Sequence, residues 1–379
     1  MVENGKRVEW IDVARGLGIL LVILGHTMTS PIRFANGYAF IVYKAIYFFH
    51  MPFMFYLSGR TFGMFRKKIE NYSFVNWTKK KGRTLMLPYI IYGLLVYIVF
   101  FIANSLPGMA RIMNNAGYGK QSFVHWLKGM ITVYGEDLYS YHLWFVYALF
   151  VMNIISFTIT KYFTHHRYIL LVVSIAFLCL RVIYPPINFW GIINLVMKCY
   201  FWFVIGSYVD FSKIVKYWYV RIYMVISLVY MCLMSIEFVK ALVPDISLYA
   251  PIKWSVEMFT CYKNALPSEA LLEPVKWVAD MGIILFFVQV SLILRGTIKR
   301  FFSYTGRNSF VIYLFHQPFV ASGFGAIMFC LFLIPIEIVI PVIVFLCYVV
   351  PLLIMKLLDT KYLSFLKPFL LGTPRKKRV

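Results

Sequence analysis

Long apolar stretches recur along the chain, and they restrict its fold more than any other feature. Ten of them approach the roughly 20 residues that a helix needs to cross the hydrocarbon core of a bilayer. They fall at residues 9–30, 40–62, 86–106, 142–161, 168–184, 191–210, 221–243, 277–295, 308–330 and 334–357. Hydrocarbon offers the backbone no hydrogen-bond partners, whereas a helix satisfies its own polar groups. We therefore predict an all-α integral membrane protein, a polytopic helical bundle with about ten transmembrane helices.

The composition excludes an ordinary soluble domain. Hydrophobic residues make up 61% of the 379 and charged residues only 14%, against about 45–50% and about 25% in soluble proteins. The six cysteines show neither CxxC pairs nor ligand spacing, so neither a disulfide framework nor a metal site is expected. We find no internal repeat or soluble segment, and we expect a single membrane-embedded domain over residues 1–379 with a short basic tail at about 358–379.

The basic residues lie mostly in short segments between the apolar stretches. The formal net charge is +23, and the segment from Arg60 to Arg83 carries eight lysines and arginines against Glu70 alone. Cytoplasmic loops of membrane proteins are enriched in Lys and Arg, so we predict that both termini and this segment are cytoplasmic. The lipid bilayer is the expected partner. No nucleic acid is expected, because the chain carries no nucleic-acid-binding motif.

The first apolar stretch carries three ionisable side chains, Asp12, Arg15 and His26. Such residues are costly inside a membrane and indicate a functional site by default. Arg15 and His26 are eleven positions apart, or about three helical turns, so they share one face about 16 Å apart along the axis. Asp12 lies one turn before Arg15, where it can fix the guanidinium. The alternative is that Arg15 anchors the helix at the membrane surface and His26 is a structural histidine.

Two further histidines lie in apolar stretches, each two residues before a proline. His50 lies in FFHMPFMFYLSG, and His316 lies in GRNSFVIYLFHQPF with Tyr313 three residues earlier. A proline leaves one carbonyl of its helix without an intrahelical donor. A lone buried histidine is more often structural, but three of them are hard to explain by packing alone. We therefore take His26, His50 and His316 as catalytic candidates.

Basic and aromatic residues mark the ends of the third and fourth stretches. Lys81 and Arg83 lie in KKKGRTLMLP, where the chain enters the membrane from the predicted cytoplasmic side. Arginine can hold a phosphate bidentately, although the positive-inside bias alone also explains basic residues here. His142 and Trp144 lie in YHLWF at the predicted outer interface, where an aromatic belt is the alternative for the tryptophan.

Together these residues resemble the membrane acyltransferase family 3, which contains O-antigen, capsule, fucose and nodulation-factor O-acetyltransferases. The similar features are Trp10-Ile-Asp12-x-x-Arg15-Gly followed after ten residues by His26, the FFHMPFMFYLSG segment, Arg83 ahead of Pro88, HLWF at 142–145 and NSFVIYLFHQP at 308–318. They span most of the chain. The arginine–histidine first helix and the FHMP segment are the specific part, whereas HLWF and YLFHQP are weaker alone.

The resemblance implies a membrane-bound O-acetyltransferase in the plasma or inner membrane of the cell. Acetyl-CoA would be the cytoplasmic donor, and the acceptor would be a hydroxyl of an extracytoplasmic or lipid-linked carbohydrate, such as a cell-surface polysaccharide. His26 would be the general base or a transient acyl acceptor, and His50 would assist the base or polarise the thioester carbonyl. Asp12, Arg15, Lys81 and Arg83 would bind the donor, and His142, Trp144 and Tyr313 would lie on the acceptor side, with His316 as a third catalytic candidate.

The chain departs from some relatives in one respect. Those relatives carry a soluble esterase-like domain after the last helix, whereas this chain ends at Val379, soon after its tenth apolar stretch. The membrane domain is then expected to deliver the acetyl group to the final acceptor itself, or to a partner.

Two functions of other classes compete with this interpretation. A transporter or flippase for a lipid-linked saccharide would use the histidines as proton relays, but it predicts inverted repeats with broken helices in matching halves, which we do not find. A non-catalytic membrane scaffold or sensor would leave the third intramembrane histidine unexplained.

The orientation is testable with reporter fusions. Fusions after residue 70 and after residue 300 should report the cytoplasm, and fusions near residues 120 and 260 should report the exterior, because basic loops stay inside. An exterior reading at residue 70 would overturn the orientation and the side from which CoA enters.

Overall fold

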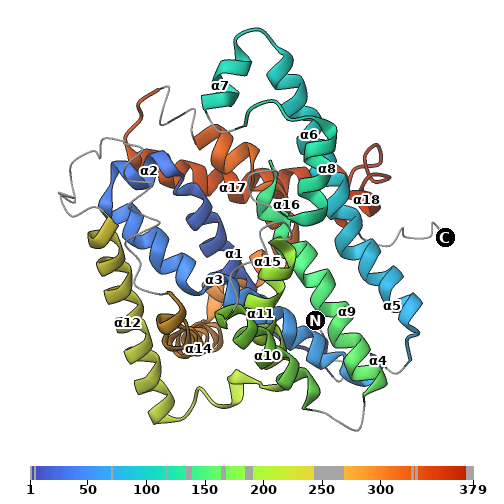
Figure 1. Ribbon diagram of the computed structural model, residues 1–379, viewed down its shortest axis with the longest axis vertical. Helices are drawn as coiled ribbons and strands as arrows, with labels where there is room; N and C mark the ends of the chain where they lie inside the picture. The colour runs from blue at the N-terminus through green and yellow to red at the C-terminus, as the bar shows by residue number, and fades with distance from the viewer. Residues whose placement is uncertain are drawn as a thin grey trace. The chain divides into compact units, whose positions relative to one another are not determined.

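The structure of the protein is a computed structural model, shown in Figure 1. It describes residues 2–3, 6–69, 71–115, 118–133, 139–163, 168–183, 191–242, 269–325, 328 and 332–372. The chain divides into two compact units. Unit 1 comprises Met1–Leu57, Val209–Ser309 and Phe319–Tyr348, and unit 2 comprises Ser58–Tyr208, Phe310–Pro318 and Val349–Val379. A single domain over the whole chain stays a prediction.

Unit 1 contains the predicted first, seventh and eighth membrane stretches and most of the second. Its elements are β1 (Val2–Glu3), β2 (Lys6–Arg7), α1 (Glu9–Thr27), α2 (Ser30–Ala35), most of α3 (Gly37–Met64), the 3-10 helix η4 (Phe211–Lys213), α12 (Trp218–Leu242), α14 (Glu269–Ile293), α15 (Gly296–Arg307), the π-helix η5 (Phe319–Phe324) and the first part of α17 (Ile336–Leu358). The strands β1 and β2 pair antiparallel, Val2 with Arg7 and Glu3 with Lys6.

Unit 2 contains the predicted third to sixth stretches. Its elements are α4 (Arg66–Ile69), α5 (Phe74–Lys81), the π-helix η1 (Gly82–Met86), α6 (Leu87–Ser105), α7 (Met109–Asn115), α8 (Phe123–Thr132), the 3-10 helix η3 (Tyr141–Leu143), α9 (Trp144–Tyr162), α10 (Ile169–Ile183), α11 (Gly191–Tyr208), nearly all of α16 (Ser309–Phe315), the end of α17 and α18 (Lys367–Leu371). The segment from Phe74 to Ser105 is one continuous helix with a π-turn inside, so helix begins well before the predicted start at residue 86.

The predicted fold class, an all-α polytopic membrane protein, is confirmed. Eight helical segments among the described residues are long and apolar enough to cross a membrane. They are Glu9–Thr27, Gly37–Met64, Phe74–Ser105, Tyr141–Tyr162, Gly191–Tyr208, Trp218–Ile236, Pro274–Ile293 and Ile336–Leu358. The predicted fifth stretch is the shorter helix α10. Ten spans and cytoplasmic termini stay predictions.

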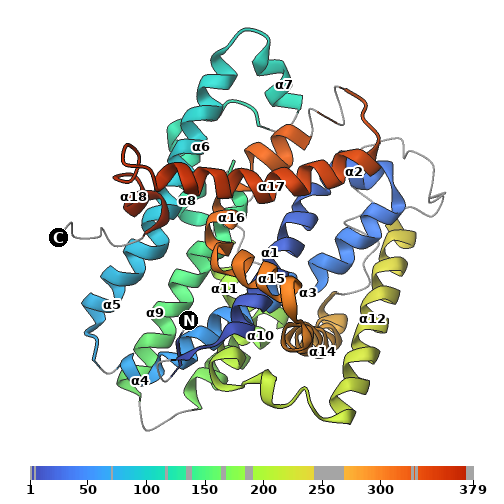
Figure 2. The same ribbon diagram turned by 180° about the vertical axis from the view of Figure 1, so that it is seen from behind.

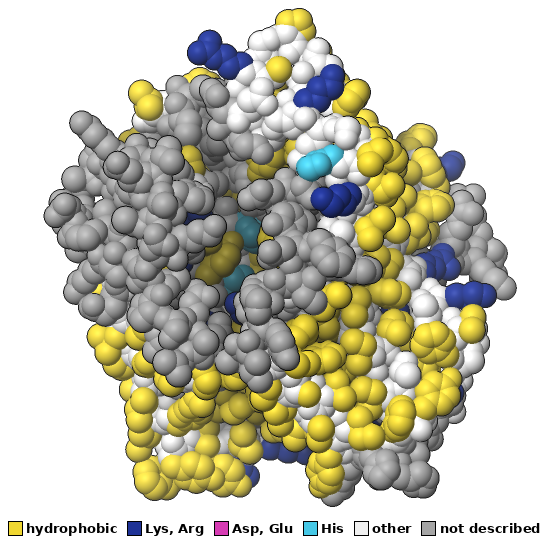
Figure 3. Space-filling view, viewed as in Figure 1, with side chains coloured by type: hydrophobic (Ala, Val, Ile, Leu, Met, Phe, Trp, Pro, Cys, Tyr) yellow, Lys and Arg dark blue, Asp and Glu magenta, His cyan; other side chains and the backbone are white. Residues whose placement is uncertain are grey.

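The surface agrees with a lipid environment. Large apolar side chains point outward from long helices, such as Val225 (60% exposed) on α12 and Phe345 (62% exposed) on α17. Hydrophobic side chains cover much of the described surface in Figure 3, and no Asp or Glu is visible among the described residues of that face. In water such a surface would be unfavourable, whereas hydrocarbon matches it.

The predicted ninth stretch, residues 308–330, is not one continuous helix. Helix α16 ends at Phe315, His316 to Pro318 lie outside it, and the π-helix η5 begins at Phe319. Pro318 explains the break, because its nitrogen carries no proton for the helical ladder and its ring clashes with the preceding turn. Pro318 predicts a break in the helix, but the hydropathy of the stretch alone predicted one continuous helix across it.

Glycines set the position of α1 within unit 1. A Cβ on Gly25 would lie 2.9 Å from the Tyr47 ring, and one on Gly18 would lie 2.6 Å from the Met54 sulfur, so both glycines admit side chains of α3. On α15, Phe302 presents its carbonyl to Gly16 so closely that a Cβ there would overlap it. Helices in membranes approach closely through small residues, because their backbones then make van der Waals contact. Figures 1 and 2 both show α1 beside α15.

The reciprocal contact between α1 and α15 uses Gly306. A Cβ on Gly306 would overlap the backbone carbonyl of Asp12. At the start of α1, Glu9 forms an ion pair with Lys299 of α15 at 2.7 Å. Gly16 and Gly306 thus bring the two backbones together beside Asp12 and Arg15.

Gly306→Ala should destabilise the protein, because backbone cannot give way as a flexible side chain can. We expect a loss of about 1–3 kcal/mol, the usual cost of overpacking, seen as a lower Tm of the purified protein in detergent. Gly82→Ala is the matched control, because nothing lies within 4 Å of a Cβ at Gly82. An equal loss of Tm in both variants would contradict the packing argument.

Candidate functional site

The three ionisable residues of the first stretch all lie on the unbroken helix α1. Asp12 is 3% exposed, and Arg15 is half-buried and interacts electrostatically with Asp12. His26 is half-buried in the last turn, one residue before the helix ends at Thr27. The imidazole therefore lies at the far end of α1 from Arg15, which is the outer end in the predicted orientation.

Tyr47 links the two candidate histidines of unit 1. Its hydroxyl lies 3.3 Å from His26 Nδ1, and its ring centroid lies 4.6 Å from that of His50. Tyr47 and His50 are three residues apart on α3 and so share a face of that helix. The structure therefore brings His26 and His50 into one site, which we call the His26–Tyr47–His50 site.

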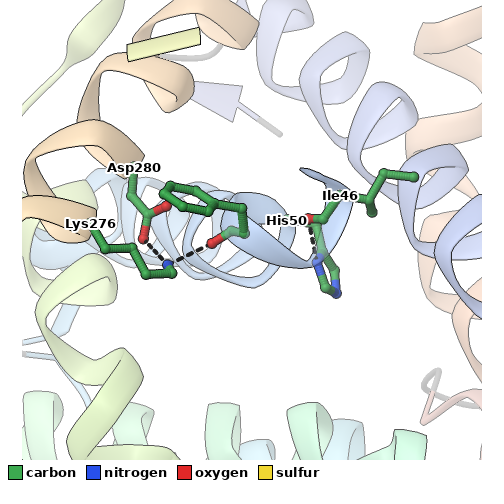
Figure 4. Close-up of polar contacts among 5 residues, drawn as sticks. Ile46, His50, Lys276 and Asp280 are labelled. Atoms are coloured by element: carbon green, nitrogen blue, oxygen red, sulfur yellow. Dashed lines mark hydrogen bonds and ion pairs between the residues drawn. The ribbon is translucent and has the colours of Figure 1, made fainter. Parts of the chain in front are cut away.

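The hydrogen bond of His50 determines which of its nitrogens is basic. Nδ1 lies 2.8 Å from the carbonyl oxygen of Ile46, one turn earlier on α3, as Figure 4 shows. A carbonyl only accepts hydrogen bonds, so Nδ1 carries the proton in this contact. In the neutral imidazole the lone pair is then on Nε2. The side chain is 3% exposed, and its ring orientation is fixed by its own helix.

A row of aromatic contacts continues from Tyr47 to α2. The rings of Tyr43 and Tyr47 have centroids 4.0 Å apart and are tilted by 32°. The guanidinium of Arg33 lies 4.1 Å above the Tyr43 ring, an attractive cation–π distance. Arg33 also donates to the Met28 carbonyl at 2.9 Å, so α2 is attached to the end of α1 beside the site.

Unit 2 brings together His142, Tyr313 and His316. The imidazole centroids of His142 and His316 are 5.5 Å apart, and the Tyr313 hydroxyl donates to the backbone carbonyl of His142. His316 Nδ1 lies 2.8 Å from the Tyr313 carbonyl, so Nε2 again carries the lone pair of the neutral ring. His142 and His316 are 7% and 0% exposed.

Two side chains of unit 2, those of His142 and Tyr92, contact carbonyls at the break after α16. The Leu314 carbonyl, four residues before Pro318, lies 3.4 Å from His142 Nε2. The Gln317 carbonyl accepts from the hydroxyl of Tyr92 on α6. His142 thus has a backbone partner at the break, whereas Tyr313 donates to the His142 carbonyl on η3. The acceptor-side role of both residues stays a prediction. Trp144 is half-buried at the start of α9 and packs edge-to-face on Phe145.

The predicted donor-binding residues Lys81 and Arg83 lie at the π-turn of the third stretch. The Lys81 ammonium lies 4.9 Å from the ring centroid of buried Trp77. Arg83 is exposed, and within the described part of the chain its guanidinium has no hydrogen-bond or ion-pair partner. Nearby, Lys80 hydrogen-bonds the Tyr72 hydroxyl at 2.9 Å and lowers the pKa of Tyr72 by favouring its anion. The donor-binding role of Lys81 and Arg83 stays a prediction.

Sequence reasoning missed several members of these sites. Tyr47 carried one signal, its i, i+3 spacing to His50. Lys276 and Asp280 form an ion pair on α14 at 2.6 Å, but the predicted stretch began at residue 277 and left Lys276 in a loop. Tyr92 carried no signal, because its partner Gln317 is far away in sequence.

Comparison with known families shows to which family the chain belongs. The model of an acyltransferase domain, that of acyltransferase family 3, matches residues 8–358, essentially the whole chain. The chain belongs to acyltransferase family 3. Comparison with curated proteins and with solved structures found no significant match. Family membership makes the protein a multi-pass membrane acyltransferase, and it confirms the family to which the sequence motifs pointed.

Proposed function

We propose that the protein is an O-acetyltransferase of the plasma or inner membrane that moves an acetyl group from cytoplasmic acetyl-CoA to a hydroxyl of an extracytoplasmic or lipid-linked carbohydrate. The observation that carries the proposal is the His26–Tyr47–His50 site. It couples an imidazole at the end of α1 to a second imidazole of fixed tautomer on α3. Family membership supports acyl transfer over transport or a scaffold role.

The donor side is supported by the basic residues at the predicted cytoplasmic surface. CoA carries phosphates, and charge-assisted hydrogen bonds from arginine hold phosphate strongly. Arg83 is exposed on the π-turn η1, and Arg15 lies about 16 Å along α1 from His26. Lys81 adds positive charge beside Arg83, and Asp12 orients Arg15. A donor held by its phosphates would extend its pantetheine arm towards the deeper imidazole.

The chemistry requires one proton to move from the acceptor to the leaving thiol. His26 Nε2 removes the hydroxyl proton while the acceptor oxygen attacks the thioester carbonyl carbon and forms the new C–O bond. The C–S bond then breaks, and the imidazolium returns the proton to the departing sulfur. The products are the acetyl ester and CoA with a free thiol.

Tyr47 prepares His26 for this step. Its hydroxyl lies 3.3 Å from His26 Nδ1. We assign the proton of this contact to His26, so that the Tyr47 oxygen accepts from Nδ1–H and the lone pair of His26 is on Nε2. His50 has its Nδ1 proton engaged by Ile46, so the neutral ring has no proton to offer a thioester carbonyl. Of its two expected roles, assisting the base is the one that this hydrogen bond favours.

The acceptor would arrive from the outer side. His26 lies at the last turn of α1, and the row of Tyr47, Tyr43 and Arg33 leads from it to α2. Tyrosine hydroxyls and a guanidinium offer hydrogen bonds to sugar hydroxyls. His142, Trp144, Tyr313 and His316 in unit 2 remain candidates for acceptor binding and catalysis.

His26→Ala should abolish acetyl transfer while donor binding and folding stay nearly intact. General-base contributions are typically 10²–10⁴-fold, so kcat should fall by that order. The assay is acetyl transfer by purified protein to a panel of glycans, with CoA affinity measured on the same samples. Mass spectrometry of protein quenched without acceptor would detect an acetylated His26 if the imidazole carries the group covalently.

His125→Ala is the matched control, because His125 is an exposed histidine on α8 and should not affect kcat. Wild-type turnover in His26→Ala would end the assignment of the base and pass it to His50. An absence of acetyl-CoA turnover by the wild type with every glycan would contradict the proposed function itself.

Arg83→Ala and Arg15→Ala should each weaken CoA binding, because each removes a charge-assisted contact to phosphate. We expect roughly tenfold or more in Kd for Arg83→Ala, as hydrogen bonds to charged groups contribute about 1.5–3 kcal/mol. Isothermal titration with CoA measures this. Arg111→Ala, on exposed α7 in the predicted outer segment, should leave Kd unchanged. Unchanged affinity in both test variants would return these arginines to anchoring roles.

A further inference from the structure

Pro52 creates an unsatisfied carbonyl inside α3. In an α-helix each backbone N–H donates to the carbonyl four residues earlier. Pro52 has no N–H, so the carbonyl of Phe48 receives no bond from it. Phe48 lies two residues before His50 and immediately after Tyr47. The turn that carries the site is therefore the turn that has lost a backbone hydrogen bond.

A charged side chain from another helix donates a hydrogen bond to this carbonyl. Lys276 Nζ of α14 lies 2.6 Å from the Phe48 carbonyl oxygen and 2.6 Å from Asp280 Oδ2, as Figure 4 shows. The same ammonium lies 4.5 Å from the centroid of the Phe48 ring. An ammonium has three donors, and two of them are engaged here in good geometry.

The Lys276–Asp280 pair costs more free energy in a membrane span than an uncharged partner for the Phe48 carbonyl would. The side chain of Asp280 is 1% exposed, and both residues lie in the membrane-spanning segment Pro274–Ile293. Ionisable residues in such segments are costly and mark functional sites by default. Ser or Thr can satisfy a proline-freed carbonyl without any charge. A purely structural need therefore does not account for a lysine and a carboxylate.

A comparable arrangement accompanies the other His-x-Pro segment. Pro318 frees the carbonyl of Leu314, and the side chain of His142 lies 3.4 Å from it. In each unit the Nδ1 of the histidine two residues before the proline contacts a backbone carbonyl three or four residues earlier. In each unit a basic side chain from elsewhere contacts the carbonyl that the proline leaves.

We propose that Lys276 and Asp280 are positioning residues that hold the proline-broken turn of α3, and with it His50 and Tyr47, in the geometry that acyl transfer requires. Lys276 fixes the Phe48 carbonyl, and Asp280 fixes Lys276. The Ile46 carbonyl that binds His50 Nδ1 lies in the same turn. This role rests on the proposed function, since it assigns the turn to the same reaction.

The test removes the pair without leaving a buried charge unpaired, which would itself be strongly destabilising. Lys276→Met/Asp280→Leu should keep the CoA affinity of the wild type and lower kcat by about 10²-fold, the effect of misplacing a catalytic group by about 1 Å. The single variant Lys276→Arg keeps both the charge and the donor, and it should retain most of the wild-type kcat. If the double variant does not fold, Asp280→Asn is the second variant to measure. It keeps an acceptor for Lys276 but removes the negative charge, so its kcat should lie between those of the wild type and of a protein without the pair.

A second readout is independent of turnover. In ¹⁵N-histidine NMR spectra, with His50→Gln for assignment, the double variant should shift or split the His50 signals while His125 stays unchanged. An unaltered His50 signal, or wild-type kcat in the double variant, would overturn the positioning role. If the wild type acetylates no glycan, the proposed function fails, and the spectrum alone then decides whether Lys276 and Asp280 position His50.

Discussion

A membrane helix that contains a proline has one carbonyl oxygen that neither its own backbone nor the surrounding hydrocarbon satisfies. On α3 this oxygen belongs to Phe48. At the break after α16, Pro318 likewise has no N–H for the carbonyl of Leu314, and each of these two oxygens has a side-chain partner on a different element. These contacts join the His-x-Pro turn of α3 to α14 and the His-x-Pro turn after α16 to η3. The imidazoles of His50 and His316 are then oriented by carbonyls of the same turns.

The glycine contacts of α1 complement this constraint. Gly16 and Gly306 hold the Arg15 end of α1 against α15, and Gly25 admits the Tyr47 ring near the other end. Because α1 is one continuous helix, its length sets the separation between the Arg15 guanidinium and the His26 imidazole. A donor that binds by its phosphates at one end and reacts at the other needs a constant separation, and one rigid helix supplies it.

The sequence predicted well what depends on local pattern. Hydropathy located the long helices, and helical periodicity placed Arg15 and His26 on one helix, because both signals arise within a single element. It failed where distant segments decide the structure. The partners Tyr47 and Lys276 are defined by contacts between helices, and Tyr92 contacts a carbonyl 225 positions away. Pro318 predicts the break at His316, but the high mean hydropathy of the stretch led to the prediction of one continuous helix.

Proton balance separates the proposed reaction from transport through the same fold. Transfer from a thioester to an alcohol takes one proton from the hydroxyl and returns one to the thiol, so the reaction neither consumes a proton from solvent nor releases one to it. A relay through the bilayer would require a chain of titratable groups leading from one surface to the other. The His26–Tyr47–His50 site instead fixes one imidazole tautomer by a backbone carbonyl and places a hydroxyl beside the second imidazole. Such an arrangement can hold a proton during a single chemical step and return it where the step ends, which is what acyl transfer needs.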